Sequence, residues 1–166
     1  MIIITTERLN LRTFKLIDRD FLYELDNNKI VNKFRSTDER TMDFCIEQIN
    51  NWNSRYNNDL LNVYLIELRE TKVPVGLIFL VRKDNNRIEL GYRILDVHWE
   101  RGYCSEACTL LLIEYFKRNN DNVYAETHAE NINSIKLLSK LGFKEIEYSW
   151  EYNCREFQLE KTQFSM

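Results

Sequence analysis

Proline and glycine are scarce in this chain, which has one proline and four glycines among 166 residues. Linkers between domains are usually rich in these residues, and no such stretch divides the chain. A chain of this length can bury a sizeable core as one unit. We therefore expect a single domain over residues 1–166.

Long apolar runs are also absent. No uninterrupted run approaches the roughly 20 residues that a membrane-spanning helix needs. The first ten residues, MIIITTERLN, lack the basic segment and the cleavage site of a secretory signal. These absences predict a cytoplasmic protein that has no membrane partner.

The sequence has no CxxC pair. Its four cysteines are Cys45, Cys104, Cys108 and Cys154. Their scattered positions predict reduced thiols rather than a disulfide framework. Cys104 and Cys108 together with His98 would leave a zinc ion without a fourth ligand, so we expect no metal site.

Positive charge is not in excess, since 23 basic residues face 26 acidic residues and the net charge is -3. Non-specific binding to nucleic acid depends on a strongly basic surface. We therefore expect no nucleic-acid partner. Apolar residues make up 44% of the chain and aromatic residues 13%, which is the composition of a globular protein.

The spacing of apolar residues predicts both strands and helices. Residues 8–14 alternate apolar with polar side chains, as in a half-buried strand. Residues 75–81 are nearly all apolar, which predicts a central strand covered on both faces. The expected strands are residues 8–14, 62–69, 75–82, 87–95, 122–128, 143–150 and 152–160. The expected helices are residues 18–25, residues 41–56, a helix whose first turn carries Gly102, and residues 131–141.

Polar residues and one glycine mark the expected helix ends. Asp18 is a candidate cap for the first helix. Ser36, Thr37 and Asp38 are candidate caps before the second helix. Gly142 fits the position just after the last helix, where a left-handed backbone conformation is common.

The segment WERGYCSEA, residues 99–107, joins a strand pattern to a helical one. A helix start leaves backbone N–H groups without partners and carries the positive end of the helix dipole, so it can hold a phosphate. Arg101 adds a positive charge, and Gly102 lets the backbone approach a ligand closely. The pattern predicts an anion site, although an ordinary helix start with a loop glycine fits it too.

This segment resembles motif A of the GNAT superfamily of acyl-CoA-dependent N-acyltransferases. The pyrophosphate loop of that motif has the pattern Gln/Arg-x-x-Gly-x-Gly/Ala. Trp99, Gly102 and Cys104 occupy its three defined positions, so the central glycine alone is standard. The wider pattern is similar to the ribosomal-protein-N-acetyltransferase-like branch, in ELGYRIL, WxxGYxxEA, AENINSIKLLSKLGF and the opening TERLNLRTF.

The resemblance implies an α+β fold of the GNAT type. Such a fold has a mostly antiparallel, seven-stranded central sheet and about four helices, in the order β-α-α-β-β-β-α-β-α-β-β. The sheet splits after its fourth strand and leaves a V-shaped slot for the pantetheine arm of the cofactor.

The resemblance also implies that acetyl-CoA is the cosubstrate and indicates where its pyrophosphate binds. The expected contacts are Arg101, Gly102, Tyr103, Cys104 and Ser105, at the helix start. Their backbone N–H groups would hold the phosphate oxygens.

The pantetheine arm is expected to pair with a strand edge at Arg93, Ile94 and Leu95, which the sequence alone would assign to a core strand. Asn131 and Ser134 are expected to face the arm near its sulfur, although Asn131 can equally serve as a helix cap.

An attacking amine must be neutral, so a base has to take its proton. Glu89 is the leading candidate, because similar enzymes often place a glutamate on the fourth strand. Glu126 and His128 on the fifth strand are rivals. Superfamily members that use a tyrosine as general acid carry it seven positions after the asparagine, where this chain has Leu138.

We expect an N-acetyltransferase that moves acetyl from acetyl-CoA to a primary amine by direct attack in a ternary complex. The amine could belong to a protein N-terminus or to a small molecule. Residues 27–38 and the final hairpin, with Tyr148, Trp150 and Tyr152, would select it or simply pack. The alternative is a catalytically silent GNAT-like module that binds acyl-CoA as a sensor or interaction domain. Both a monomer and a homodimer fit the sequence.

Overall fold

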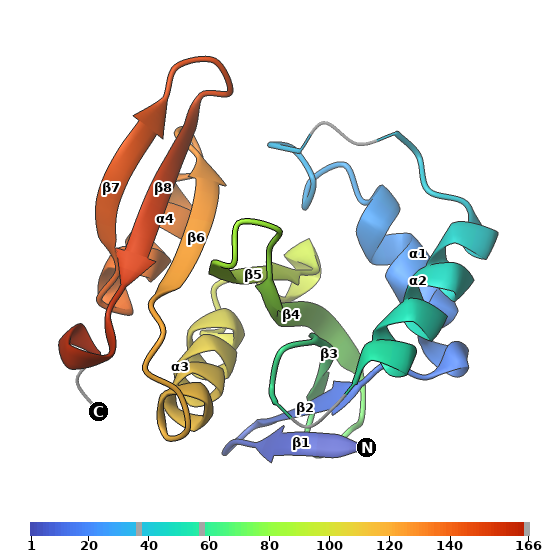
Figure 1. Ribbon diagram of the computed structural model, residues 1–166. Helices are drawn as coiled ribbons and strands as arrows, with labels where there is room; N and C mark the ends of the chain where they lie inside the picture. Colours follow the sequence, from blue (N-terminus) through green and yellow to red (C-terminus); the bar gives the residue numbers. More distant parts are fainter. Residues whose placement is uncertain (36–37, 57–58, 165–166) are drawn as a thin grey trace.

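The computed structural model describes residues 1–35, 38–56 and 59–164 (Figure 1). The described part is a mixed fold of strands and helices, as the sequence predicts. The strands are β1 (Ile2–Thr5), β2 (Leu9–Thr13), β3 (Val63–Leu68), β4 (Pro74–Arg82), β5 (Ile88–Ile94), β6 (Val123–His128), β7 (Lys144–Ser149) and β8 (Cys154–Leu159). The helices are α1 (Arg19–Asn27), α2 (Met42–Arg55), α3 (Tyr103–Phe116) and α4 (Ile132–Lys140).

Within the described residues the sheet has eight strands, one more than the seven that the sequence predicts. Its order is β1-β2-β3-β4-β5-β6-β8-β7, and β1 is the additional edge strand. The sequence pattern misses β1 because its four residues, IIIT, do not alternate apolar with polar side chains. It pairs with β2 irregularly, since the register shifts between Ile2 and Ile4.

Helices cover both faces of the sheet. Tyr64 and Ile66 of β3 belong to the apolar cluster that includes α3 and α4. The alternate residues Val63 and Leu65 belong to the cluster that includes α1 and α2. β4 lies between β3 and β5 and contributes to both clusters, which confirms the prediction of a central strand covered on both faces. Figure 1 shows α3 on one side of β4 and the α1–α2 pair on the other.

The sheet divides in its middle, between β5 and β6. These strands are the one parallel pair among the described strands, and they pair at two positions, Ile88 with Val123 and Glu89 with Tyr124. Beyond Tyr124, β6 continues along β8, while β5 continues along β4. β6, β8 and β7 therefore turn away from β5 as a separate arm (Figure 1). This is the V-shaped split that the resemblance implies.

The second helix lies where it is predicted, but its cap differs from the predicted candidates. Thr41 directly precedes α2, and its hydroxyl oxygen accepts the backbone N–H of Phe44 at 3.1 Å. Asp38 does not cap α2, because a capping side chain must lie within reach of the second or third helical N–H. Ser36 and Thr37, the other predicted caps, lie outside the described residues.

The last helix ends as predicted. Gly142 follows α4 with a φ of 92°, a left-handed conformation that favours glycine. Its N–H donates to Ser139 O at 3.1 Å, and Phe143 N–H donates to Leu138 O at 3.0 Å. These two bonds form a Schellman motif, which satisfies carbonyl groups that the helix leaves open.

Asp18 directly precedes α1, but its side chain does not cap the helix. Its carboxylate instead accepts two bonds from the Arg12 guanidinium, at 2.7 and 2.8 Å, and one from the Lys15 backbone N–H at 2.7 Å. Arg12 Nε also donates to Glu67 at 2.5 Å. All three charged residues of this network are buried. The network therefore ties β2 and β3 to the start of α1.

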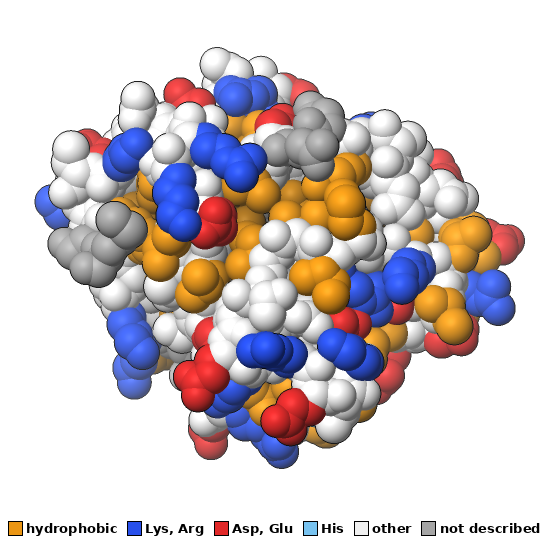
Figure 2. All heavy atoms as spheres, turned by 90° about the horizontal axis from the view of Figure 1, so that it is seen from below, with side chains coloured by type: hydrophobic (Ala, Val, Ile, Leu, Met, Phe, Trp, Pro, Cys, Tyr) orange, Lys and Arg blue, Asp and Glu red, His pale blue; other side chains and the backbone are white. Residues whose placement is uncertain are grey.

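The surface carries both signs of charge. Figure 2 shows one face on which Lys and Arg side chains are interspersed with Asp and Glu side chains around exposed apolar atoms. This face has no continuous field of one sign. Within the described residues, no helix is both long enough and apolar enough to span a bilayer.

The buried network predicts the effect of replacing Arg12. Arg12→Met should lower the free energy of unfolding by roughly 3–5 kcal/mol, because two buried carboxylates lose their counter-charge. Urea denaturation measures this loss. Arg82→Met is the matched control, since Arg82 is exposed and lies 3.8 Å from Asp121, and it should cost at most about 1 kcal/mol. Equal losses in the two variants would contradict a structural role for the network.

Candidate functional site

The start of α3 is an open helix N-terminus. Gly102 precedes the helix with a φ of 77°, and Arg101 and Gly102 are both exposed. Glu106 N–H makes the first intrahelical bond, to Gly102 O at 3.1 Å. The backbone N–H groups of residues 103–105 therefore have no partner within the helix. The structure thus brings together the residues predicted to hold an anion.

Arg8, which directly precedes β2, braces this helix start. Its Nη1 donates to Arg101 O at 2.9 Å, and its Nε donates to Glu106 Oε2 at 2.7 Å. Its guanidinium also lies 4.9 Å from the centre of the Tyr103 ring. The alternating pattern of residues 8–14 predicts a strand at Arg8 but not this contact, and the place of Arg8 in TERLNLRTF is its one signal in the sequence. The N-terminal segment is therefore part of the site.

Glu106 receives several hydrogen bonds on the first turn of α3. Its carboxylate accepts the Thr6 hydroxyl, the backbone N–H of Arg8 at 3.0 Å and the Arg8 guanidinium. Burial acts to raise the pKa of Glu106, but the bonds from Thr6 and Arg8 outweigh it and lower the pKa below 4.5. Glu106 therefore stays charged and holds α3 against the β1–β2 turn.

Along β5, the backbone N–H and C=O groups of successive residues point alternately toward β4 and toward the split. Leu95 N–H donates to Val75 O at 2.9 Å, so the backbone of Leu95 faces β4. Antiparallel pairing alternates along a strand, so the backbone of Arg93 also faces β4, while Tyr92 and Ile94 face the split. Of the three predicted edge residues, Ile94 therefore lies on the open edge and Arg93 and Leu95 do not. This difference depends on the register with β4, which the sequence does not reveal.

Trp99 fixes the loop that follows β5. Its indole Nε1 donates to Ile94 O at 2.8 Å. Trp99 stands at the first motif position, where the family pattern has glutamine or arginine. Its side chain binds the end of β5. This bond places the start of α3 beside the open end of the split.

The two residues predicted on α4 lie across the split from β5. Asn131 Oδ1 accepts Ser134 N–H at 3.2 Å, so Asn131 caps α4. Ser134 Oγ lies 2.9 Å from the hydroxyl of Tyr92. Burial raises the pKa of Tyr92 well above its usual value, so the hydroxyl keeps its proton. Tyr92 is a functional candidate that the sequence analysis missed, because a strand tyrosine gave no signal that it reaches α4.

Leu138 is 1% exposed and belongs to the core, so it does not line the split.

All four cysteines are free thiols, as predicted. Burial raises the pKa of the Cys108 thiol, which keeps it protonated. Across the part of the chain that the structure describes, no group of three or more His, Cys, Asp and Glu residues is arranged to hold a metal ion.

Glu89 lies at the last pair between β5 and β6, where the split begins. Its Oε1 lies 3.2 Å from Lys83 Nζ. Burial raises the pKa of Glu89 above 4.5; Lys83 opposes this shift, and Glu126 and Glu156 add to it. A carboxylate with a raised pKa is a better proton acceptor than an ordinary one.

The rival bases have less suitable surroundings. Glu126 is exposed on β6 and lies opposite Glu156 in the register of β6 and β8. The His128 ring stacks on Phe34 with centres 5.1 Å apart. His128 Nδ1 accepts the backbone N–H of Glu130 at 3.2 Å, so the lone pair on that nitrogen is already engaged.

The final hairpin forms an exposed aromatic group rather than a packed one. Trp150 is 86% exposed and Tyr152 is 68% exposed. The Tyr148 ring meets the Trp150 ring edge-on with centres 4.6 Å apart. Packing into the core is therefore not the role of Trp150 and Tyr152.

A comparison with known proteins agrees with this geometry. Residues 8–144 match the family model described as an acetyltransferase (GNAT) domain. The chain belongs to the GNAT acetyltransferase family. The superfamily that the sequence resemblance indicated is confirmed, and the split sheet is the GNAT sheet.

Known relatives match this GNAT protein along most of its length. It is 32% identical over 146 residues to the N-acetyltransferase p20 of Bacillus licheniformis, a match that covers 84% of this chain and 80% of the relative. The crystal structure of a GNAT-family acetyltransferase from Bacillus anthracis has a TM-score of 0.83 at 20% identity, with 98% and 99% of the chains covered. Spermidine N-acetyltransferase from Vibrio cholerae, solved with CoA and spermine, has a TM-score of 0.80 at 19% identity, with 96% and 99% covered.

The bonds to Glu106 predict a pH-dependent stability. Glu106→Gln should lower the free energy of unfolding by roughly 1–3 kcal/mol at neutral pH, because charge-assisted bonds from Thr6 and Arg8 are lost. A lowered pKa stabilises the fold above the unfolded-state value and loses that effect as the pH falls through the folded-state value. The difference should therefore shrink in urea titrations carried out below pH 4.5.

Glu114→Gln is the control, since Glu114 on the same helix pairs with exposed Lys117, and the loss should be at most about 0.5 kcal/mol. A Glu106→Gln loss that stayed constant from neutral to acidic pH would count against the assigned role.

Proposed function

We propose that this GNAT protein transfers an acetyl group from acetyl-CoA to a primary amine. The proposal rests on the parting of β5 and β6 after Glu89, with the open start of α3 beside the split. Coenzyme A has a diphosphate and an extended arm that contains amides. A helix N-terminus suits the diphosphate, and an unpaired strand edge suits the arm.

Each part of the site has a role toward the cosubstrate. The free N–H groups of residues 103–105 bind the diphosphate, and Arg101 adds charge. Gly102 leaves the approach open because it has no side chain. The arm runs along β5, where the backbone of Tyr92 and Ile94 faces the split. Asn131 and Ser134, across the split on α4, contact the arm near its sulfur.

Glu89 acts as the base. A typical amine is protonated at neutral pH, so its proton must leave before the nitrogen attacks. Glu89 takes this proton, directly or through water, as the new N–C bond forms at the thioester carbonyl. The C–S bond then breaks, and its electron pair leaves on the sulfur. A backbone N–H of β5 polarises the carbonyl during attack.

Tyr92 assists the leaving sulfur. Leu138 stands where some superfamily members have an acidic tyrosine, and it is buried in the core. The hydroxyl of Tyr92 reaches Ser134, the residue expected near the sulfur. Because its pKa is raised by burial, Tyr92 donates a hydrogen bond to the thiolate without losing its proton. Full protonation by the protein is unnecessary, since a thiol of pKa about 8.5 leaves readily.

The relatives support acetyl-CoA as the donor more strongly than they support any particular acceptor amine. The Vibrio cholerae enzyme was solved with CoA and spermine. Its identity of 19% to this chain shows a shared fold, so its polyamine acceptor is not carried over.

Release of coenzyme A tests the proposed function. The purified protein should liberate free thiol from acetyl-CoA when a mixture of primary amines is added. Thiol release is expected because the split holds the thioester beside Glu89. Binding of acetyl-CoA without thiol release from any amine would contradict the proposal and identify an acyl-CoA-binding module.

Two variants separate the base from the hydrogen-bond donor. Glu89→Gln should lower the rate by about a hundredfold or more and flatten the rise of rate with pH, which in the native protein runs through a pKa raised above 4.5. Tyr92→Phe should lower kcat about tenfold and leave that pH profile in place. A pH profile that Glu89→Gln leaves unchanged would remove Glu89 from the mechanism.

A further inference from the structure

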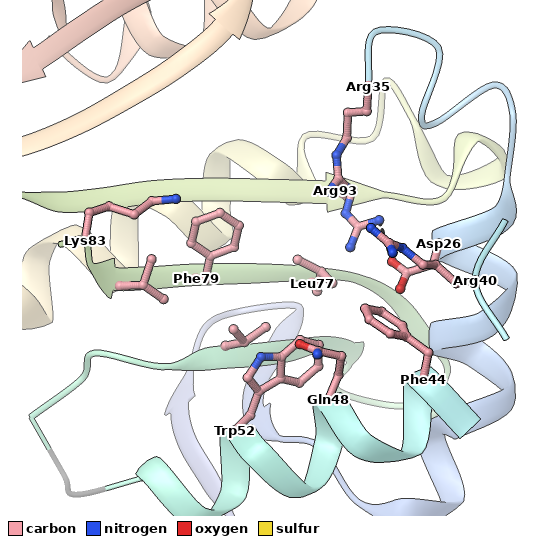
Figure 3. A pocket seen from close by; sticks show the side chains of 12 residues that line it. Asp26, Arg35, Arg40, Phe44, Gln48, Trp52, Leu77, Phe79, Lys83 and Arg93 are labelled. Carbon is pink, nitrogen blue, oxygen red and sulfur yellow. Dashed lines mark ion pairs between the residues drawn. The ribbon is translucent and has the colours of Figure 1, made fainter. Parts of the chain in front are cut away.

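Apart from the split between β5 and β6, the protein has a hollow on the face of the sheet that α1 and α2 cover, which we call the second hollow. Its volume is about 240 Å³ (Figure 3). Its floor comes from alternate residues of β4 and one wall comes from one face of α2. These residues are Leu77, Phe79 and Val81 on β4 and Phe44, Gln48 and Trp52 on α2. The hollow is therefore largely apolar along its length, and it is smaller than the roughly 300–1,000 Å³ of pockets for drug-sized ligands, so it suits a short molecule.

Three arginines meet at one end of this hollow. Arg35, Arg40 and Arg93 line it there, together with one carboxylate, Asp26 (Figure 3). Arg93 Nη1 lies 2.6 Å from Asp26 Oδ1, and both side chains are less than one fifth exposed, at 16% and 11%. One carboxylate can balance one guanidinium, so among the described residues two positive charges at this end are left without an anion.

Arg35 and Arg40 form no ion pair with any carboxylate in the described part of the chain. Arg35 Nη1 donates to Asn32 Oδ1 at 3.3 Å, and that oxygen also accepts Arg93 Nη1 at 3.2 Å. The Arg40 guanidinium lies 4.4 Å from the centre of the Phe44 ring. Although the Arg35 side chain is exposed, partial desolvation followed by the nearby charge of Arg93 lowers its pKa. Like charges held together in this way favour binding of an anion.

The opposite end of the hollow adjoins a group of carboxylates that lies outside it. Lys83 lines that end and also borders a neighbouring hollow that contains Glu89, Glu126 and Glu156. Lys83 is paired with Glu89, and Arg87 is paired with Glu156. Three carboxylates thus face two basic residues around the position proposed for the attacking amine.

We propose that the acetyl acceptor is a primary amine whose far end carries a carboxylate or a phosphate, bound by Arg35, Arg40 and Arg93. This rests on the proposed function, which places the amine at Glu89. Guanidinium groups bind both anions through paired hydrogen bonds. A polycationic amine would be repelled at the arginine end, and a simple alkyl amine would leave the arginines unpaired.

The strand geometry sets the length of the acceptor. Arg93 and Glu89 are four residues apart on β5, which corresponds to ~13 Å at a rise of about 3.3 Å per residue. Arg93 lines this hollow, whereas Glu89 lines the neighbouring hollow that Lys83 also borders, so the acceptor has to reach past Lys83. The apolar floor between Arg93 and Lys83 favours a short alkyl or aryl body.

A matched set of amines tests the proposal. Hexylamine, 6-aminohexanoate and 1,6-diaminohexane share a primary amine and a six-carbon chain and end in a neutral, a negative and a positive group. With acetyl-CoA, 6-aminohexanoate should have a kcat/KM about tenfold above hexylamine, because charge-assisted bonds form at the arginine end. The diamine should be the poorest of the three. 5-Aminopentylphosphonate, run beside them, distinguishes a phosphate-type acceptor from a carboxylate.

Variants of Arg40 test whether the preference for 6-aminohexanoate over hexylamine depends on the second hollow. Arg40→Gln should reduce the advantage of 6-aminohexanoate over hexylamine about tenfold, mainly through KM. Arg40→Glu should reverse the order and favour 1,6-diaminohexane. Arg19→Gln is the matched control, because Arg19 is an exposed residue of α1 that does not line the hollow, and it should leave the preference unchanged.

The outcomes separate this proposal from the proposed function. Acetylation that favours the diamine, or a preference that Arg40→Gln and Arg40→Glu leave unchanged, would overturn the anionic acceptor and leave the acetyltransferase intact. If no amine is acetylated, binding of hexanoate still tests whether the arginine end binds an anion. Hexanoate should raise the melting temperature of the native protein and of Arg19→Gln but not of Arg40→Gln, and the same response in all three would overturn the proposal.

Discussion

The parting of β5 from β6 is the constraint on which the rest of this structure depends. Two residue pairs hold the strands together, and the last of them is Glu89 with Tyr124. Beyond that pair, β6 takes β8 as its partner, and one edge of β5 is left without a strand. An unpaired strand edge inside a folded protein needs another source of hydrogen bonds. The pantetheine arm of coenzyme A supplies amides of the required kind in the proposed function.

The opening is held in place by contacts from distant parts of the sequence. Trp99 binds the last carbonyl of β5, and Arg8 and Glu106 hold the first turn of α3. Arg12 and Asp18 join the sheet to α1, whose Asp26 holds one arginine of the second hollow. In the proposed function, the same scaffold positions the cofactor on one face of the sheet and the acceptor on the other. An acceptor with one anionic and one cationic end would match the arginines of the second hollow and the carboxylates beyond Lys83.

The sequence was informative where local pattern determines structure. The central strand, the glycine after α4 and the helix start at Gly102 each follow from a run of apolar residues or from one conformational requirement. The sequence was uninformative where two distant segments must meet. The register of β4 against β5 decides that Ile94, rather than Leu95, faces the split. The reach of Tyr92 to Ser134 is likewise a product of the fold.

Hydrogen exchange of backbone amides with and without coenzyme A tests the central claim most directly. The amides of Tyr92 and Ile94 face the split, and those of residues 103–105 form the open start of α3. Binding of coenzyme A should slow exchange at both groups together, because each gains a hydrogen-bond acceptor. Coenzyme A that bound without protecting either group, or that failed to bind at all, would contradict the account.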